Sequence, residues 1–116
     1  MKNDLHQQQC QACEGIGTAL NAEQIKNLMP QLQNEWQVKN HHTELHRTFQ
    51  FKNYYQTMAF VNALAWVAHQ QNHHPDLTVS YNRCDVTWST HALKGLSMND
   101  FICAAKTDQL LISSKA

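Results

Sequence analysis

The feature that most constrains the fold is the spacing of its apolar residues, which twice changes from a helical period to an alternating one. Apolar residues recur at helical spacing in some stretches and alternate with polar residues in others. Short turns separate the alternating stretches of each pair, as in antiparallel hairpins. The helical stretches lie around 25–32, 58–68 and 101–110, and the alternating ones around 36–38, 45–51, 77–81 and 84–90.

This order predicts an α+β fold in which the elements follow one another as α-β-β-α-β-β-α. We expect a four-stranded antiparallel sheet with three helices packed on one face, because each helix and each strand has an apolar side to bury. Asn21 and Asn53 are the predicted caps of the first two helices. Pro30 should end or kink the first helix near Leu28 or Met29, and Pro75 should end the second helix by 72–73.

The composition indicates a globular chain without a charged face. Its 116 residues are 42% hydrophobic, and nine Lys and Arg balance nine Asp and Glu. Without a basic cluster to neutralise phosphates, nucleic-acid binding is not expected. No apolar stretch reaches membrane-spanning length and no signal peptide opens the chain, so we expect a soluble cytoplasmic protein.

The N-terminal residues differ in character from the rest of the chain. We predict a flexible arm over residues 1–17 and a single domain over 18–116. The arm contains Cys10 and Cys13, and the four cysteines of the chain are too few and scattered for a secreted disulfide scaffold. A solitary CxxC is half of a four-cysteine zinc site, so metal held there, with His6 as a further ligand, is an alternative rather than our expectation.

Eight histidines in so short a chain are the strongest functional signal. Imidazole both gives and takes protons near neutral pH. His69 and His73 are four residues apart and share a helical face if the helix persists that far. Pro75 turns His74 out of the helix, and His91 follows the last predicted strand. We therefore predict a site built from a helix end and a strand end.

Each of these residues also has a purely structural interpretation. His69 fits a solvated helix surface, His73 and His74 fit an exposed turn, and His91 fits a loop residue bonded to a backbone carbonyl. Asp100 lies at the third position of the last predicted helix, where a carboxylate caps the backbone and interacts with the helix dipole. We therefore treat Asp100 first as a structural support.

A zinc site is the remaining alternative for the histidines. Two histidines four apart on a helix can ligate zinc, and His91 could supply a third nitrogen. The residues between His69 and His73 are Gln-Gln-Asn, so the glutamate of an H-E-x-x-H site is missing. We therefore expect neither a metal nor another cofactor.

The histidines belong to a longer spaced pattern that resembles the signature of the pterin-4a-carbinolamine dehydratases. The similarity covers about residues 18 to 113, and the Cys-x-x-Cys-Glu-Gly start resembles microbial members of that family. The matching positions are His73-His74-Pro75, Tyr81-Asn82, Ser89-Thr90-His91, Gly95-Leu96-Ser97 and Asp100.

The resemblance implies a reaction and an assembly. The family eliminates water from 4a-hydroxytetrahydropterin to give quinonoid dihydropterin, a lyase reaction. This step recycles the cofactor of aromatic amino-acid hydroxylases, notably phenylalanine hydroxylase. The resemblance also implies a homodimer or homotetramer. A non-catalytic dimerisation or interaction protein with the same fold is the alternative, and the intact histidine set favours catalysis over it.

The resemblance also assigns the site residues. It places His73, His74 and His91 in the active site as the catalytic group. We expect His73 and His91 to exchange protons while His74 binds and orients the pterin. Many family members carry an acidic residue where this chain has His69. The residues expected to bind or support the substrate are Asp100, His69, Pro75, Ser89 and Thr90.

Overall fold

The computed structural model describes residues 5–11 and 17–113 and confirms the predicted α+β fold. Four antiparallel strands form one sheet in the order β1-β2-β4-β3. The elements follow the predicted helix-strand-strand-helix-strand-strand-helix order. They are α1 (Ala22–Leu28), β1 (Gln37–Lys39), β2 (Glu44–Gln50), α2 (Tyr54–Gln71), β3 (Asp76–Ser80), β4 (Arg83–Trp88) and α3 (Met98–Ser113).

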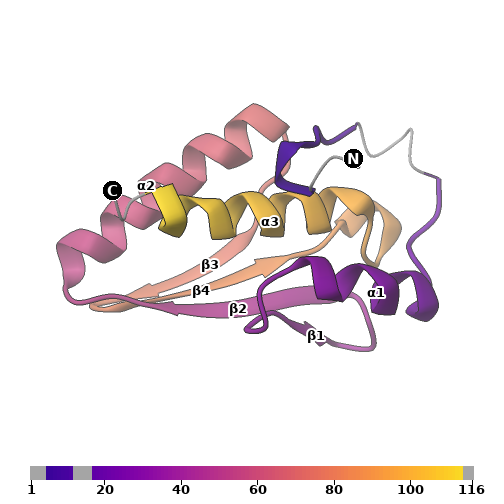
Figure 1. Ribbon diagram of the computed structural model, residues 1–116, viewed down its shortest axis with the longest axis horizontal. Coiled ribbons are helices and arrows are strands. Elements are labelled where there is room, and N and C mark those ends of the chain that lie inside the picture. The colour runs from indigo at the N-terminus through magenta and orange to yellow at the C-terminus, as the bar shows by residue number, and fades with distance from the viewer. Residues whose placement is uncertain (1–4, 12–16, 114–116) are drawn as a thin grey trace.

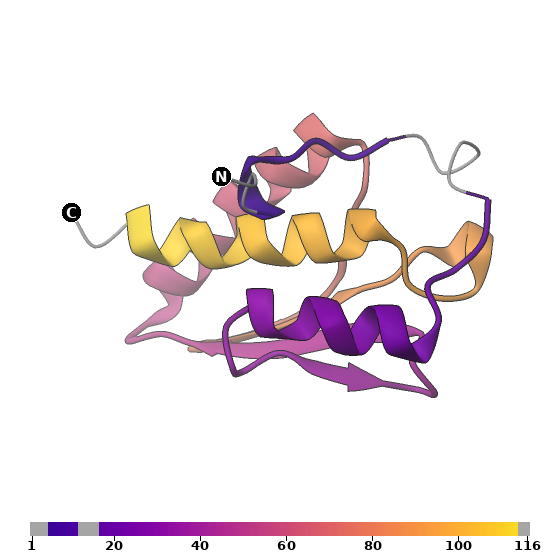
Figure 2. The same ribbon diagram turned by 45° about the vertical axis from the view of Figure 1, so that its right-hand side comes forward.

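The three α-helices cover the same face of the sheet. Figure 2 shows α3 running above the sheet, with α2 behind it and α1 in front. The longest two helices lie side by side, and α1 lies beside the β1 edge (Figure 1). In the described ranges, no helix is long and apolar enough to cross a membrane.

The helix limits follow from local signals in the sequence. The Asn21 side chain accepts from the backbone N–H of Gln24, whose own side chain accepts from Asn21 N–H, which completes a capping box. At the start of α2 the Asn53 side chain accepts from the backbone N–H of Gln56 and so caps that helix. As Pro30 predicts, α1 ends at Leu28, and a 3₁₀ turn follows.

Alternation along the two central strands sorts their side chains between the helices and the open face. Leu45 pairs with Trp88, and Phe49 pairs with Cys84, and all four side chains are buried beneath the helices. Trp88 is fully buried and anchors the centre of this layer. The core is therefore the space between β2, β4 and the three helices.

One charged pair lies inside this apolar layer. Arg47 points to the same side as Leu45 and Phe49, and its Nη1 lies 2.6 Å from Oδ1 of Asp108 on α3. Trp36 Nε1 donates to both oxygens of the same carboxylate, at 2.9 and 3.0 Å. Burial raises the pKa of Asp108 above its ordinary value, and the contacts with Trp36 and Arg47 oppose that shift.

The described part of the N-terminal arm packs against the domain. Leu5 opens a short 3₁₀ helix, η1 (Leu5–Gln7), and is 3% exposed in the core. The Nζ of Lys106 on α3 donates to the carbonyl of His6 at 2.8 Å. Cys13 lies outside the described residues. The predicted flexibility of residues 1–17 and the predicted domain boundary at residue 18 stay predictions.

Replacing Arg47 by Met tests the buried pair. The Asp108 carboxylate would remain buried without its cation, and breaking one partner of a buried pair costs about 3 kcal/mol or more at neutral pH. Losing Arg47 should raise the pKa of Asp108 further above its unfolded value. A folded state that binds the extra proton loses stability as pH rises between the two pKa values, so the deficit should shrink in acid.

Urea unfolding of Arg47→Met at several pH values, followed by tryptophan fluorescence, measures this deficit. Arg83→Met is the matched control, because Arg83 lies on β4 with its side chain 52% exposed, 3.6 Å from Asp85. Removing that surface pair should change the free energy of unfolding by about 1 kcal/mol at most. A pH-independent loss in Arg47→Met, or one no larger than in Arg83→Met, would contradict the role given to the buried pair.

Candidate active site

A buried carboxylate organises the candidate site. Asp100 lies in the first turn of α3 and has no exposed surface. Its Oδ2 accepts from the backbone N–H of Ser97 at 2.9 Å and from the Thr90 hydroxyl at 2.7 Å. Its Oδ1 lies 2.6 Å from Nε2 of His73. One side chain thus joins the end of β4, the start of α3 and the segment after α2.

His73 reaches this carboxylate because α2 ends abruptly. Asn72 has the left-handed conformation, with φ of 53°, and its N–H bonds back to the carbonyls of Ala68 and His69. The reversal folds the His73 ring onto Trp88, with ring centroids 5.4 Å apart and planes 18° apart. His73 is consequently 8% exposed.

The contact with Asp100 determines which nitrogen of His73 carries its proton. A carboxylate only accepts hydrogen bonds, so Nε2 of His73 must be the donor. In the neutral ring Nδ1 is then left as the proton acceptor. The Thr90 hydroxyl donates its one hydrogen bond to Asp100. In the contact of 2.8 Å between the Thr90 and Ser97 hydroxyls, Ser97 must therefore be the donor. The arrangement holds one imidazole in one tautomer.

His73 lines a pocket of about 400 Å³ at the C-terminal end of α2. His74 and His69 also line it, and both are exposed. His69 lies one helical turn before the end of α2, with its ring centroid 5.6 Å from that of Trp66. The remaining lining residues are Ala65, Ala68, Asn72, Pro75 and Leu77.

His91 lies in a different hollow. It opens the 3₁₀ turn η4 (His91–Leu93) and is exposed beside a pocket of about 260 Å³ that Ser89, Thr90 and Lys94 also line. The loop is closed by the Thr90 N–H, which donates to Gly95 O at 2.9 Å. The structure therefore connects His91 to His73 through Thr90 and Asp100, and does not bring the three histidines into one pocket.

The predicted site residues thus fall into three groups. His73, Thr90 and Asp100 are joined by buried hydrogen bonds. His69, His74 and Pro75 share the pocket that His73 lines, and Ser89 shares that of His91. Among the residues that the structure describes, no three His, Cys, Asp or Glu side chains are grouped to hold a metal ion.

Three contributors were not singled out as site residues from the sequence. Trp88 supplies the surface on which His73 stacks, Ser97 completes the network around Asp100, and Asn72 turns the chain. Asn72 directly precedes His73, and asparagine tolerates the left-handed conformation, so its position carried a usable signal. The stacking of Trp88 on His73 depends on tertiary contact and has no local signal.

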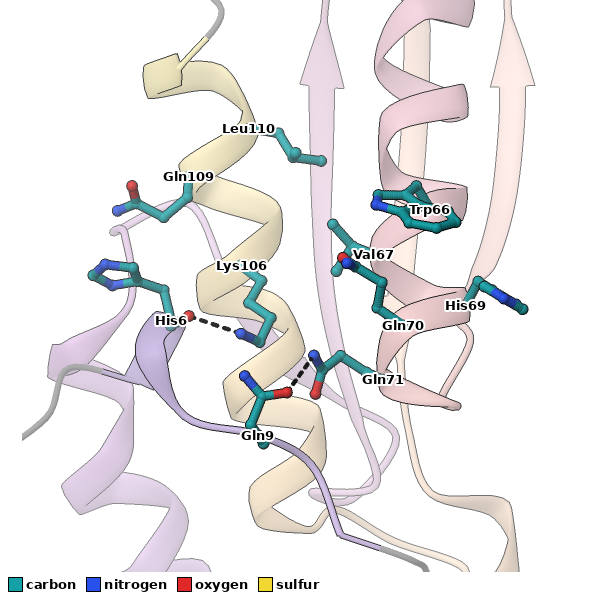
Figure 3. Close-up of a pocket in the computed structure, with 10 residues that line it drawn as sticks. All are labelled: His6, Gln9, Trp66, Val67, His69, Gln70, Gln71, Lys106, Gln109 and Leu110. Carbon is teal, nitrogen blue, oxygen red and sulfur yellow. Dashed lines mark hydrogen bonds between the residues drawn. The ribbon is translucent and has the colours of Figure 1, made fainter.

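Another pocket lies elsewhere, between α2 and α3. It measures about 760 Å³ and is lined mainly by amide and apolar side chains, together with His6, His69 and Lys106 (Figure 3). His73, His74 and His91 are not among its lining residues. We place the candidate active site at His73, because the buried hydrogen bonds of Thr90 and Asp100 connect to its ring.

Comparison with known proteins identifies the same family along most of the chain. The sequence model described as "Pterin 4 alpha carbinolamine dehydratase" matches residues 18–110. A protein of Legionella pneumophila (strain Lens), provisionally named a pterin-4-alpha-carbinolamine dehydratase, is 60% identical over 97% of this chain and 99% of its own. A Nitrosomonas eutropha protein of the same provisional name is 57% identical over 95% of this chain and 96% of its own.

A solved structure agrees in fold. The crystal structure titled transcriptional coactivator/pterin dehydratase, from Brucella melitensis, superposes with a TM-score of 0.75 at 28% identity. The match covers 80% of this chain and 98% of that one. The residues matched by the family's sequence model include His73, His91 and Asp100. The chain belongs to the pterin-4a-carbinolamine dehydratase family.

Proposed function

We propose that this protein is a 4a-hydroxytetrahydropterin dehydratase, a hydro-lyase that forms quinonoid dihydropterin. The observation that carries the proposal is the hydrogen bond of 2.6 Å between His73 and the buried Asp100, at a pocket that His74 also lines. In a member of this family, that arrangement supplies an oriented imidazole where a pterin can reach it. The family membership supports the reaction class, and the hydrogen bond to Asp100 supports the role of His73.

The reaction requires proton transfer at two atoms. A hydroxyl group leaves C4a and needs an acid, while a proton leaves N5 and needs a base. Imidazoles near neutral pH suit both tasks without a cofactor. We assign the proton transfers to His73 and His91 and the binding and orientation of the pterin to His74. Asp100 acts through His73, as a positioning residue, by holding its tautomer.

The other predicted site residues take supporting roles in this proposal. Thr90 joins Asp100 to the loop that begins at His91. Pro75 and His69 form part of the wall of the His73 pocket, and Ser89 forms part of the His91 pocket. Substrate binding would have to bring the exposed His91 ring towards the same pterin that His73 and His74 contact.

In the cell, we propose that the protein recycles the pterin cofactor of aromatic amino-acid hydroxylases such as phenylalanine hydroxylase, in the cytoplasm. We also propose that it works as a homodimer or homotetramer. Large aromatic side chains on α2 support self-association, because Tyr55 is 82% and Trp66 60% exposed.

The alternative function is that of a non-catalytic interaction protein. A solved structure with a TM-score of 0.58 and 26% identity is titled a pterin dehydratase-like protein identified as a RuBisCO assembly factor.

Replacing His91 by Ala should slow dehydration of freshly generated 4a-hydroxytetrahydropterin in stopped flow. Loss of a general acid–base group lowers kcat by about 100- to 10,000-fold. Replacing His74 by Ala should act mainly on KM, and lower kcat/KM by about 10- to 100-fold, because it removes a binding contact.

His46→Ala is the control for both variants. His46 is a histidine of β2 on the sheet face opposite Leu45, 3.9 Å from Asp85, and its loss should leave turnover unchanged. Full activity in His91→Ala would refute its assigned role. If the unmodified protein gave no acceleration over the spontaneous reaction, the interaction-protein alternative would take first place.

Replacing Asp100 by Asn should lower kcat more than it changes KM. The amide keeps an oxygen for the Ser97 N–H but no longer requires a proton on Nε2 of His73. We expect a loss of about 10- to 100-fold in kcat, smaller than that from removing an acid–base histidine. Imidazole ¹⁵N shifts of His73 should show a changed tautomer population.

Stability must be measured beside activity in this variant. A disturbed buried hydrogen bond costs about 1–3 kcal/mol of folding free energy. Kinetics are therefore recorded without urea, at a temperature at which circular dichroism shows that the variant is folded. An Asp100→Asn protein that is less stable yet keeps both its kcat and the His73 tautomer would show that Asp100 has only a structural role.

A further inference from the structure

Residues 9–11 of the N-terminal arm lie across the two helices that carry the candidate site. The side-chain amide of Gln71, at the end of α2, accepts from the Cys10 N–H at 2.8 Å. The same amide donates to the side chain of Gln9 at 3.0 Å (Figure 3). The amide of Asn99, at the start of α3, accepts from the Gln11 N–H at 3.0 Å and donates to the Gln11 carbonyl at 2.7 Å. These reciprocal bonds hold the arm in one register.

This register brings two sulfur atoms together. Cys10 Sγ lies 3.5 Å from Cys103 Sγ, although the two residues are 93 positions apart in the sequence. Cys103 is fully buried in α3, whereas Cys10 is partly exposed. A disulfide needs the sulfurs at about 2.05 Å, so closure requires a movement of about 1.5 Å. Cys10 packs partly buried at the margin of the core, whereas Cys103 is fully enclosed in it, so Cys10 is the side chain with more room to move.

The two thiols differ in how readily they ionise. The hydrogen bond with Cys103 lowers the pKa of the Cys10 thiol, and the nearby His73 and Lys106 act in the same direction, against burial. The pairing and burial raise the pKa of Cys103. Cys10 is thus the more accessible sulfur and the one that is more readily a thiolate, the form that reacts with oxidants.

We propose that Cys10 and Cys103 are a redox-active pair, oxidised by peroxides to a disulfide that fastens the arm to α3. The Cys10 thiolate attacks a peroxide oxygen, so that an S–O bond forms, the O–O bond breaks and the second oxygen leaves as hydroxide or alkoxide. The Cys103 sulfur then attacks the Cys10 sulfenic acid. An S–S bond forms, the S–O bond breaks, and the hydroxyl group leaves with the Cys103 proton as water.

The disulfide would act on the elements behind the candidate site. Cys103 lies one helical turn beyond Asp100, and Gln71 lies two residues before His73. A fastened arm keeps its bonds to Gln71 and Asn99 and thereby ties the end of α2 to the start of α3. This pairing of sulfurs is independent of the proposed dehydratase activity, so either can fail without the other.

Peptide mapping tests the pair directly. The full-length reduced protein is treated with hydrogen peroxide, the remaining free thiols are alkylated in denaturant so that buried ones react, and the non-reduced protein is cut with trypsin. Cleavage separates the cysteines, because Cys10 and Cys13 lie on residues 3–26, Cys84 on 84–94 and Cys103 on 95–106. We expect residues 3–26 to be cross-linked to 95–106, with Cys84 still alkylated. Cys84 is buried and its pKa is raised to about 11, which makes it the internal control.

Variants assign the bond. Cys13→Ser should still form the cross-link, because Cys10 is the partner. Cys10→Ser, a change at a partly exposed position, should abolish it and leave Cys103 alkylated. Cys103→Ala should abolish it and let sulfenic acid accumulate on Cys10, detected with dimedone. A Cys10–Cys13 bond in the unmodified protein, a cross-link lost in Cys13→Ser, or oxidation of Cys84 at the same rate would each overturn the proposal.

Unfolding provides a second readout that does not depend on mapping. Closing so long a loop restricts the unfolded chain, so peroxide treatment should raise the urea midpoint of the unmodified protein. It should leave the midpoint of Cys10→Ser where it was, and dithiothreitol should reverse the rise. Equal shifts in both proteins, or no shift despite a complete cross-link, would refute the fastening of the arm.

Discussion

The buried carboxylate of Asp100 is the constraint on which the arrangement of this domain depends. A charge-bearing group with no exposed surface is costly unless each of its oxygens has partners. Those partners come from three places: Ser97 before α3, Thr90 after β4 and His73 after α2. The segments must therefore converge at one point, and that point is the edge of the candidate site.

Asp100 contributes both to the stability of the domain and to the chemistry proposed for the site. The structural interpretation of Asp100, as a carboxylate in the first turn of a helix, holds, since its Oδ2 accepts from Ser97 N–H. The other oxygen of the same group faces His73 and decides where that ring carries its proton. The core packing contributes as well, because the ring is held flat against the buried Trp88. The domain interior thus presets the tautomer of His73 at the edge of the pocket.

The fold was predictable because its signals are local, whereas much of the site was not. Asn53, Pro30 and the alternation around Phe49 act within a few residues, and they marked the helix limits and the strand faces. The contacts that the sequence did not reveal join distant positions: Arg47 to Asp108, and Cys10 to Cys103. The sequence also did not reveal that the loop after β4 gives His91 a hollow separate from that of His73.

Because a left-handed residue ends α2, the length of this helix determines where His73 lies. Asn72 terminates the helix and reverses the chain in one step, so the number of residues between the Asn53 cap and Asn72 sets the direction in which His73 leaves. One added residue would rotate that direction by about 100° and advance it by about 1.5 Å. A whole added turn would restore the direction but displace the end of the helix by about 5.4 Å, so the length of α2 between Asn53 and Asn72 is itself a determinant of the site.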